Sequence, residues 1–248
     1  MNAFDYGAIY QAKFRKSLEN GTSPFLPKNG LVDLVGVYNM RTNELHRGIT
    51  QIMLQEVKAE LGVSTGGFVS AEVVQNARKQ GVQTGIKQGS HGFDILVENK
   101  EKTEKQVIKW FHESQIDGVE NLKTHLEQKM RKSAKDRQAF IDKKYPGGTA
   151  RDASLVQTDR PNTKKMVCSA KSPDQYLGQI LAGISTGTAL LVSPETEALF
   201  KEKTMKILTR EHKPGVKDKM GLLKLAASAN TICKGTVKKM YEMKKENP

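Results

Sequence analysis

The sequence predicts an α+β N-terminal domain, built from helices and a small antiparallel hairpin or sheet, followed by a mainly α-helical C-terminal domain. Two observations support this fold class. Before residue 100, apolar residues recur at helical spacing in some stretches and form short, β-prone runs in others. Beyond Asn99, long charged stretches of helical composition dominate. We therefore divide the chain into residues 1–115 and 116–248, with a polar linker near residues 145–165.

The elements of the first part follow from the spacing of their apolar residues and from the glycines that end them. Residues 6–20 have helical spacing and end at Asn20-Gly21, where glycine can adopt a left-handed cap. The Val-rich residues 31–38 predict a strand or an ordered extended segment, and two further helices are expected at 49–61 and 70–79. The last expected element is a hairpin that joins residues 82–86 and 93–97 through a glycine-containing loop.

Helices account for most of the second part. Residues 104–114 and 119–144 contain few β-branched residues, which favours helix. Two later helices are expected to begin at Pro173 and Pro194, because each proline follows a serine and precedes an acidic residue. The last helix is expected from about Lys217 to Lys245, with one apolar face that contacts the core or a partner.

Positive charge is concentrated in the second part. The chain of 248 residues has a formal net charge of +13, and residues 123–151 contain nine basic residues against three acidic ones. Such a concentrated charge favours a polyanionic partner, although a solvated basic helix would have the same composition. The cations proposed to bind nucleic acid here are Lys129, Arg131, Lys132 and Lys135.

Neither a membrane segment nor a secretory signal is expected. The longest fairly apolar run without charge, residues 176–194, is too short and too polar to cross a bilayer. The N-terminus lacks the basic and apolar regions of a secretory signal, and Cys168 and Cys233 are single and far apart. We therefore expect a cytoplasmic protein, in a bacterial host cell, whose cysteines have packing roles.

No motif in the sequence indicates catalysis. The five histidines do not form the zinc peptidase pattern H-E-x-x-H, and no phosphate-binding glycine loop or nucleophile elbow is present. The sequence therefore predicts a protein that is not an enzyme and uses no cofactor or metal.

Three blocks in the first hundred residues resemble the N-terminal, single-stranded-DNA-binding domain of ArdC-type antirestriction proteins, which plasmids and phages carry. The first is a helix that continues into Leu18-Glu19-Asn20-Gly21-Thr22 and Pro24-Phe25. The second joins Asn39-Met40-Arg41-Thr42 to Arg47-Gly48-Ile49, and the third contains Gln75-Asn76-Ala77 and Ile86-Lys87-Gln88-Gly89-Ser90-His91-Gly92. The order and spacing of the blocks match the family. Departures include Phe25 where tryptophan is usual and the missing metal-binding helix of the longer members.

The resemblance implies a non-catalytic protein of a phage or mobile genetic element that binds single-stranded DNA and counters host defence. A single strand is held by cations along its phosphates and by aromatic rings under its bases. In the resembling region the residues expected to bind phosphate are Arg41, Arg47, Gly48, Lys87 and His91. Candidates for base stacking are Phe25, Tyr38 and Phe93, for which ordinary core packing is the alternative.

A second hypothesis is a protein-interaction inhibitor that docks on a host defence nuclease or ribonucleoprotein. In that case the helical half contacts acidic protein or RNA, and neutralising its cations leaves inhibition intact. The sequence leaves open the oligomeric state and the identity of the target.

Overall fold

The computed structural model describes residues 3–98, 105–144, 164–210 and 221–246. The helices of these residues are α1 (Ala3–Glu19), α2 (Gly48–Glu60), α3 (Ala71–Lys79), α4 (Val119–Lys144), α5 (Pro173–Thr186), α6 (Pro194–Arg210) and α7 (Gly221–Glu246), with a 3-10 turn at Glu113–Gln115. The strands are β1 (Leu31–Val32), β2 (Tyr38–Asn39), β3 (Glu44–Leu45), β4 (Gly67–Ser70), β5 (Gly85–Ile86), β6 (Phe93–Glu98), β7 (Lys105–His112), β8 (Ile116–Asp117), β9 (Lys164–Val167) and β10 (Thr188–Leu191).

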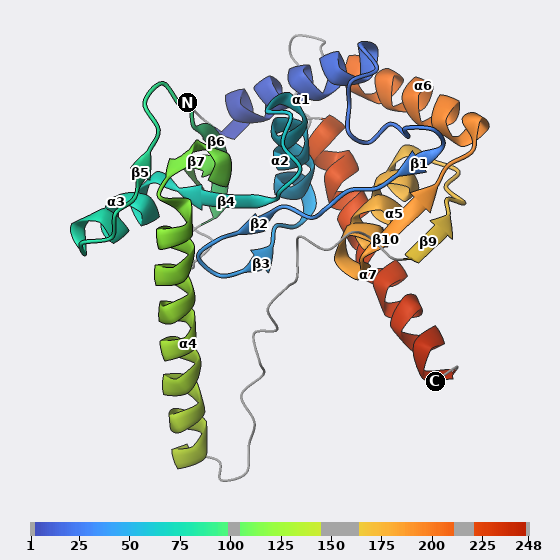
Figure 1. Cartoon of the computed structure of the whole chain (residues 1–248). Helices are drawn as coiled ribbons and strands as arrows, with labels where there is room; N and C mark the ends of the chain where they lie inside the picture. Colours follow the sequence, from blue (N-terminus) through green and yellow to red (C-terminus); the bar gives the residue numbers. More distant parts are fainter. Residues whose placement is uncertain (1–2, 99–104, 145–163, 211–220, 247–248) are drawn as a thin grey trace.

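A five-stranded sheet, in the order β3-β2-β4-β7-β6, forms one half of the molecule (Figure 1). Its residues alternate between two cores, as the twofold period of a strand requires. Phe68 and Trp110 pack with α2 on one face, whereas Val69 and Phe111 pack with α3 and with Leu122 of α4 on the other. The sheet therefore has a helix on one face and two helices on the other, and α4 extends away from it (Figure 1).

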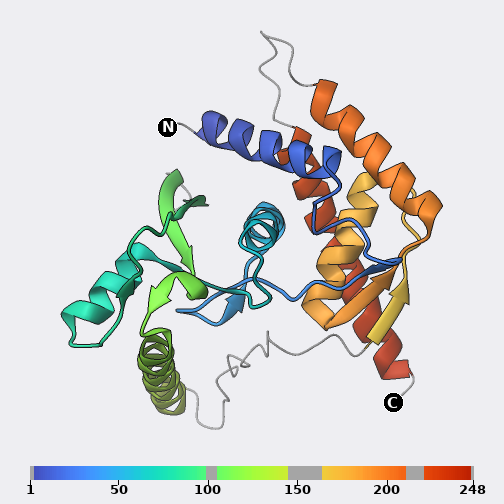
Figure 2. The same cartoon turned by 45° about the horizontal axis from the view of Figure 1, so that its top comes forward.

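The other half is a bundle of α1, α5, α6 and α7 with a small sheet in the order β1-β10-β9 (Figure 2). Residues from both ends of the chain share its core. Buried Gln11 of α1 donates a hydrogen bond to the Leu208 carbonyl (3.1 Å) and accepts one from the Leu222 amide (3.2 Å). The Tyr176 hydroxyl likewise donates to the buried Phe25 carbonyl at 2.8 Å. These contacts join α1 to α6 and α7, and the loop that follows α1 to α5.

The α+β fold class is confirmed, but two expected elements differ. Residues 85–86 do not pair with residues 93–97: β5 pairs with β8, and β6 pairs with β7, with Phe93 opposite Trp110. Residues 105–112 form strand β7, although a helix was expected there. Trp110 is buried in one core and Phe111 in the other, and this burial outweighs the helical propensity of the lysines in β7.

The expected division at residue 115 stays a prediction, and the shared core adds a contact between its two parts. Most of the expected linker, residues 145–163, lies outside the described residues. None of the described helices has the length and apolar character needed to cross a membrane.

Candidate nucleic-acid interface

A groove of about 560 Å³ opens where the sheet half meets the helical bundle. One wall comes from the turn between β2 and β3 and the start of α2, and the other from α5 and α7. The lining residues are Thr42, Asn43, Glu44, Leu45, His46, Arg47, Gly48 and Gln51 on the first wall, and Leu181, Ile184, Ser185, Asn230, Cys233, Lys234, Val237 and Lys238 on the second.

The N-terminus of α2 faces this groove. Arg47 occupies the N-cap position in an extended conformation, and its side chain makes no capping hydrogen bond. Gly48 follows with a φ of +54°, a left-handed conformation that residues other than glycine rarely adopt. No acidic residue lies in the first turn of α2, so nothing there offsets the partial positive charge of the helix end. This wall is therefore suited to an anion.

Three cations and one carboxylate line the groove, namely Arg47, Lys234, Lys238 and Glu44. Cys233, a buried residue of the α7 wall, also lines the groove. Burial raises the pKa of this thiol, while a hydrogen bond with Ser185 and the charges of Arg47 and Lys234 act in the opposite direction. Arg47 and Lys234 line the groove from opposite walls, and the groove carries a net positive charge.

His46 supports the floor of the groove as a neutral ring. Burial lowers its pKa to about 4, so the imidazole is uncharged at neutral pH. The ring packs edge-on against Trp110, with centroids 5.0 Å apart, and the His46 amide donates to the Val37 carbonyl at 3.0 Å. These contacts fix the residue before Arg47 onto the sheet.

A second basic surface lies on α4, separate from the groove. Lys129 donates to the side chain of Gln80 at 2.8 Å, and Arg131 pairs with Glu127 at 2.6 Å. Lys132 and Lys135 are exposed on the part of α4 that extends beyond the sheet. The four cations expected on this helix therefore share one element, and two of them have side-chain partners.

The remaining expected cations are dispersed. Arg41 is exposed in the turn next to the groove, and its backbone amide donates a hydrogen bond to the side-chain oxygen of Asn39 at 2.9 Å. Lys87 and His91 are exposed in the loop between β5 and β6, where Lys87 donates to the Ser114 carbonyl at 2.7 Å. The structure thus places Arg47 and Gly48 in the groove, Arg41 in the adjoining turn, and Lys87 and His91 in a different loop.

Two of the three expected stacking rings are buried. Phe25 is 0% exposed in the helical core and Tyr38 is 7% exposed in the sheet core, so neither ring offers a base an open face. Both rings are packed inside hydrophobic cores, so their role is core packing. Phe93 is half-buried against the α2 face of the sheet.

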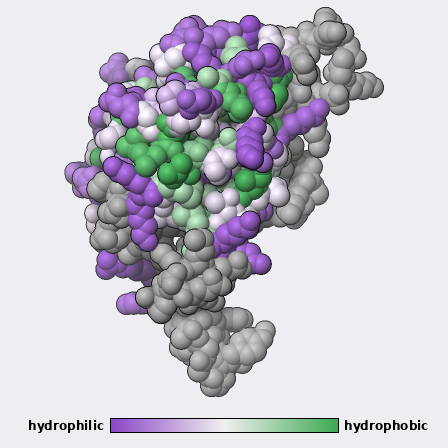
Figure 3. Space-filling view, turned by 90° about the vertical axis from the view of Figure 1, so that its right-hand side faces the viewer, coloured by the Kyte–Doolittle hydropathy of each residue, from purple (hydrophilic) through white to green (hydrophobic). Residues whose placement is uncertain are grey.

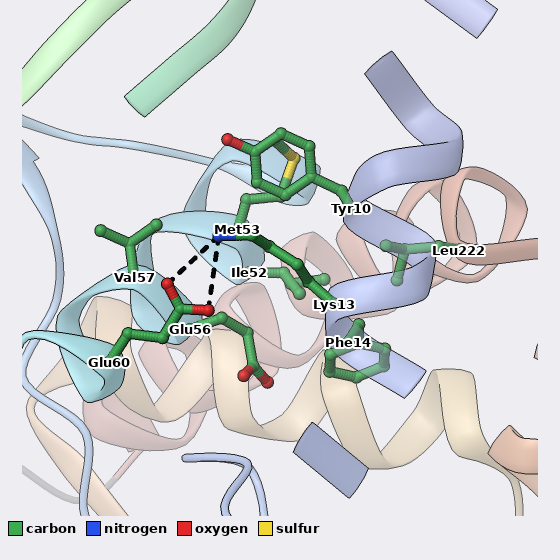
Figure 4. Close-up of a pocket in the computed structure, with 9 residues that line it drawn as sticks. All are labelled: Tyr10, Lys13, Phe14, Ile52, Met53, Glu56, Val57, Glu60 and Leu222. Carbon is green, nitrogen blue, oxygen red and sulfur yellow. Dashed lines mark hydrogen bonds and ion pairs between the residues drawn. The ribbon is translucent and has the colours of Figure 1, made fainter. Parts of the chain in front are cut away.

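A second, much smaller hollow lies between α1 and α2 (Figure 4). Its volume of about 10 Å³ is sufficient for about one water molecule. Lys13 and Glu60 form an ion pair at 3.2 Å across its opening, and the carboxylate of Glu56 lies beneath them. Burial raises the pKa of Glu56 to about 7, while a 2.5 Å hydrogen bond from Ser23 opposes the shift.

Sequence reasoning missed the α7 wall of the groove. Lys234 and Lys238 are one helical turn apart on the exposed flank of α7, a spacing that places them on one face. The sequence shows that spacing, but it does not show that Lys234 and Lys238 lie across a groove from Arg47, which is almost two hundred positions away in the chain. No group of three or more His, Cys, Asp or Glu among the described residues could hold a metal ion.

Comparison with solved structures shows what the fold is similar to. The chain aligns with the Mn(II)-bound crystal structure of the antirestriction protein ArdC from the R388 plasmid at 12% identity and a TM-score of 0.51. The alignment covers 94% of this chain and 96% of that one. The metal-free structure of the same protein aligns at 14% identity and a TM-score of 0.49, over 93% and 96% of the two chains. No family model and no curated protein matches the sequence.

These alignments extend the likeness that the sequence suggested. The resemblance in the sequence was confined to about the first hundred residues, whereas the shared fold covers nearly the whole chain.

Proposed function

We propose that this chain binds single-stranded DNA without catalysis and serves a mobile genetic element as an antirestriction, or counter-defence, protein. The observation that carries the proposal is the groove in which Arg47, Gly48 and the N-terminus of α2 meet Lys234 and Lys238. Cations and backbone amides in one groove suit a phosphate backbone. The fold shared with an antirestriction protein supports the biological role.

The number of cations in the groove sets the expected salt dependence of DNA binding. If Arg47, Lys234 and Lys238 each neutralise one phosphate, log K falls with log salt at a slope of about −2 on a single strand. Removing one of these cations is expected to reduce the slope by about 0.7. Contacts from α4 would make the slope steeper than the groove alone predicts.

Fluorescence anisotropy of the full chain with single-stranded and duplex oligonucleotides tests the proposal at several salt concentrations. We expect a preference for the single strand, and a weaker, less salt-dependent complex for Lys234→Ala. Lys239→Ala is the matched control, because Lys239 is exposed on the same helix but does not line the groove. Equal effects of the two substitutions would remove the groove from the binding surface.

The antirestriction role is tested separately, by transferring unmodified DNA into a restricting host that expresses the chain. We expect a higher recovery of transferred DNA, reduced by Lys234→Ala. Protection that survives loss of DNA binding would favour the second hypothesis, an inhibitor that docks on a host defence protein.

A further inference from the structure

The small sheet β1-β10-β9 ends at an unpaired strand. Among the described residues, β9 pairs with β10 on one side and with no strand on the other. The Cys168 amide donates to the Leu191 carbonyl at 2.7 Å, so this residue's backbone faces β10. Because successive residues of a strand point their backbone groups to opposite sides, Val167 and Lys165 direct theirs toward the open edge.

An apolar row crosses the same end of the sheet. Leu31, Leu191 and Val167 are paired in register across the three strands. Their exposure increases toward the edge: Leu31 is half-buried, Leu191 is 40% exposed and Val167 is 70% exposed. The neighbouring row, which contains Leu190, is buried in the helical core.

Other apolar residues are exposed on the same side of the molecule (Figure 3). Figure 3 shows the side of the molecule that carries β9, β10 and α6, where hydrophobic residues gather and hydrophilic residues surround them. Val167 and Leu191 are two of the four large apolar residues that are exposed among the described residues. Exposed apolar residues that adjoin one another, with a polar rim, are typical of an interaction surface.

The charge around this edge selects the partner. The described residues from Lys164 to Pro173 contain three lysines and no acidic residue. Two copies of the chain that paired through β9 would bring these lysines together, which like charges disfavour. Lys165 is two residues from Val167 and is exposed on the same face of β9, so a segment with an apolar residue opposite Val167 and an acidic residue opposite Lys165 meets both requirements.

We propose that β9 accepts an extended acidic segment of a partner protein as a fourth strand of the small sheet. The backbone of Val167 and Lys165 supplies the hydrogen bonds, and the row Leu31, Leu191 and Val167 supplies the apolar contact. Strand addition of this kind obtains affinity from main-chain hydrogen bonds and specificity from alternate side chains. The site is distinct from the groove and requires no nucleic acid.

The test titrates the full chain with fluorescent eight-residue peptides and reads anisotropy. The probe carries valine and glutamate two residues apart, on the same face, with threonine between them, and the comparison peptide carries lysine in place of each glutamate. We expect saturable binding of the acidic peptide, at least tenfold weaker binding of the basic one, and weaker acidic-peptide binding for Lys165→Glu.

Two substitutions separate strand addition from nonspecific attraction. Val167→Pro removes an amide that faces the open edge while leaving the β10 ladder intact, and we expect it to abolish peptide binding. The control is Val107→Asp, a substitution at an exposed apolar residue of the other sheet, which should leave binding unchanged. Sedimentation of each variant verifies folding and assembly.

Three results would overturn the proposal: no binding of the acidic peptide at millimolar concentration, equal binding of both peptides, or binding that Val167→Pro leaves intact. A concentration-dependent dimer that dissociates in Val167→Pro would also overturn it, because the occupant of the edge would then be a second copy.

Discussion

Replacing the buried Glu56 by glutamine should stabilise the protein above neutral pH and have little effect in mild acid. Glu56 is 7% exposed, accepts a hydrogen bond from Ser23, and lies near Glu60 and Lys13 at the junction of α1 and α2. Burial disfavours its charged form and raises its pKa from 4.5 to about 7. The folded protein therefore binds a proton at this site that the unfolded chain has released.

The sign and size of the effect follow from this difference. Between pH 4.5 and about 7 the native state binds more protons than the unfolded state, so the contribution of Glu56 to stability falls as pH rises. At 1.36 kcal/mol per pH unit, the full loss is about 3 kcal/mol, most of it between pH 5 and 8. Glutamine retains an oxygen for Ser23 and has no charge to desolvate.

Urea unfolding of both proteins at pH 5 and pH 8 measures this difference. We expect Glu56→Gln to be more stable than the parent by up to about 3 kcal/mol at pH 8 and by less than 1 kcal/mol at pH 5. The control is Glu60→Gln, which removes an exposed carboxylate of the same helix and should change little at either pH. The same difference at both pH values would refute an elevated pKa at Glu56.

Three further predictions concern other parts of the fold. Gly48→Ala is expected to destabilise the protein by about 1 to 2 kcal/mol, because the φ of Gly48 is +54°. Gly235→Ala should stabilise α7 by up to about 1 kcal/mol, because no atom lies within 4 Å of the added carbon. Thermal unfolding measures both effects. Lys123→Met should destabilise by about 2 kcal/mol, because it leaves the buried Glu113 carboxylate without its 2.8 Å partner, and the loss should shrink when acid protonates Glu113. A chain that ends at residue 115 should fail to order α1, which circular dichroism would detect as a helical content well below that of α1, α2 and α3 combined; full helicity would instead support residues 1–115 as an independent domain.

The sequence predicted the helices better than the strands. The apolar spacing of residues 49–61 and the capping pattern at Pro173 each describe a local preference, and α2 and α5 begin within a residue of the expected positions. The pairing of β5 with β8 depends on residues thirty positions apart, and no turn chemistry at the glycine-rich loop encodes it. Strand β7 was missed because its lysines resemble those of a solvated helix.

The candidate groove shows the same division between local and distant information. Arg47 and Gly48 were identified because they adjoin in a block that resembles the ArdC family and because a glycine beside a cation lets the backbone come close to a phosphate. Their counterparts on α7 were not, because the chain must first pack α7 against α5 and α2 before Lys234 comes near Arg47. The sequence alone therefore gives no reason to group Arg47 and Gly48 with Lys234 and Lys238.

The shared core also limits how the two walls of the groove can act. Gln11 holds α1 to both α6 and α7, and α2 packs in the same core as α7, so neither wall moves without breaking buried contacts. A groove between rigid elements is preorganised for its ligand, which reduces the entropy lost on binding. Weakening this core at a distance from the groove, for example by Phe14→Ala in α1, should therefore lower DNA affinity without removing any cation. Unchanged affinity in a folded Phe14→Ala variant would show that each wall binds independently.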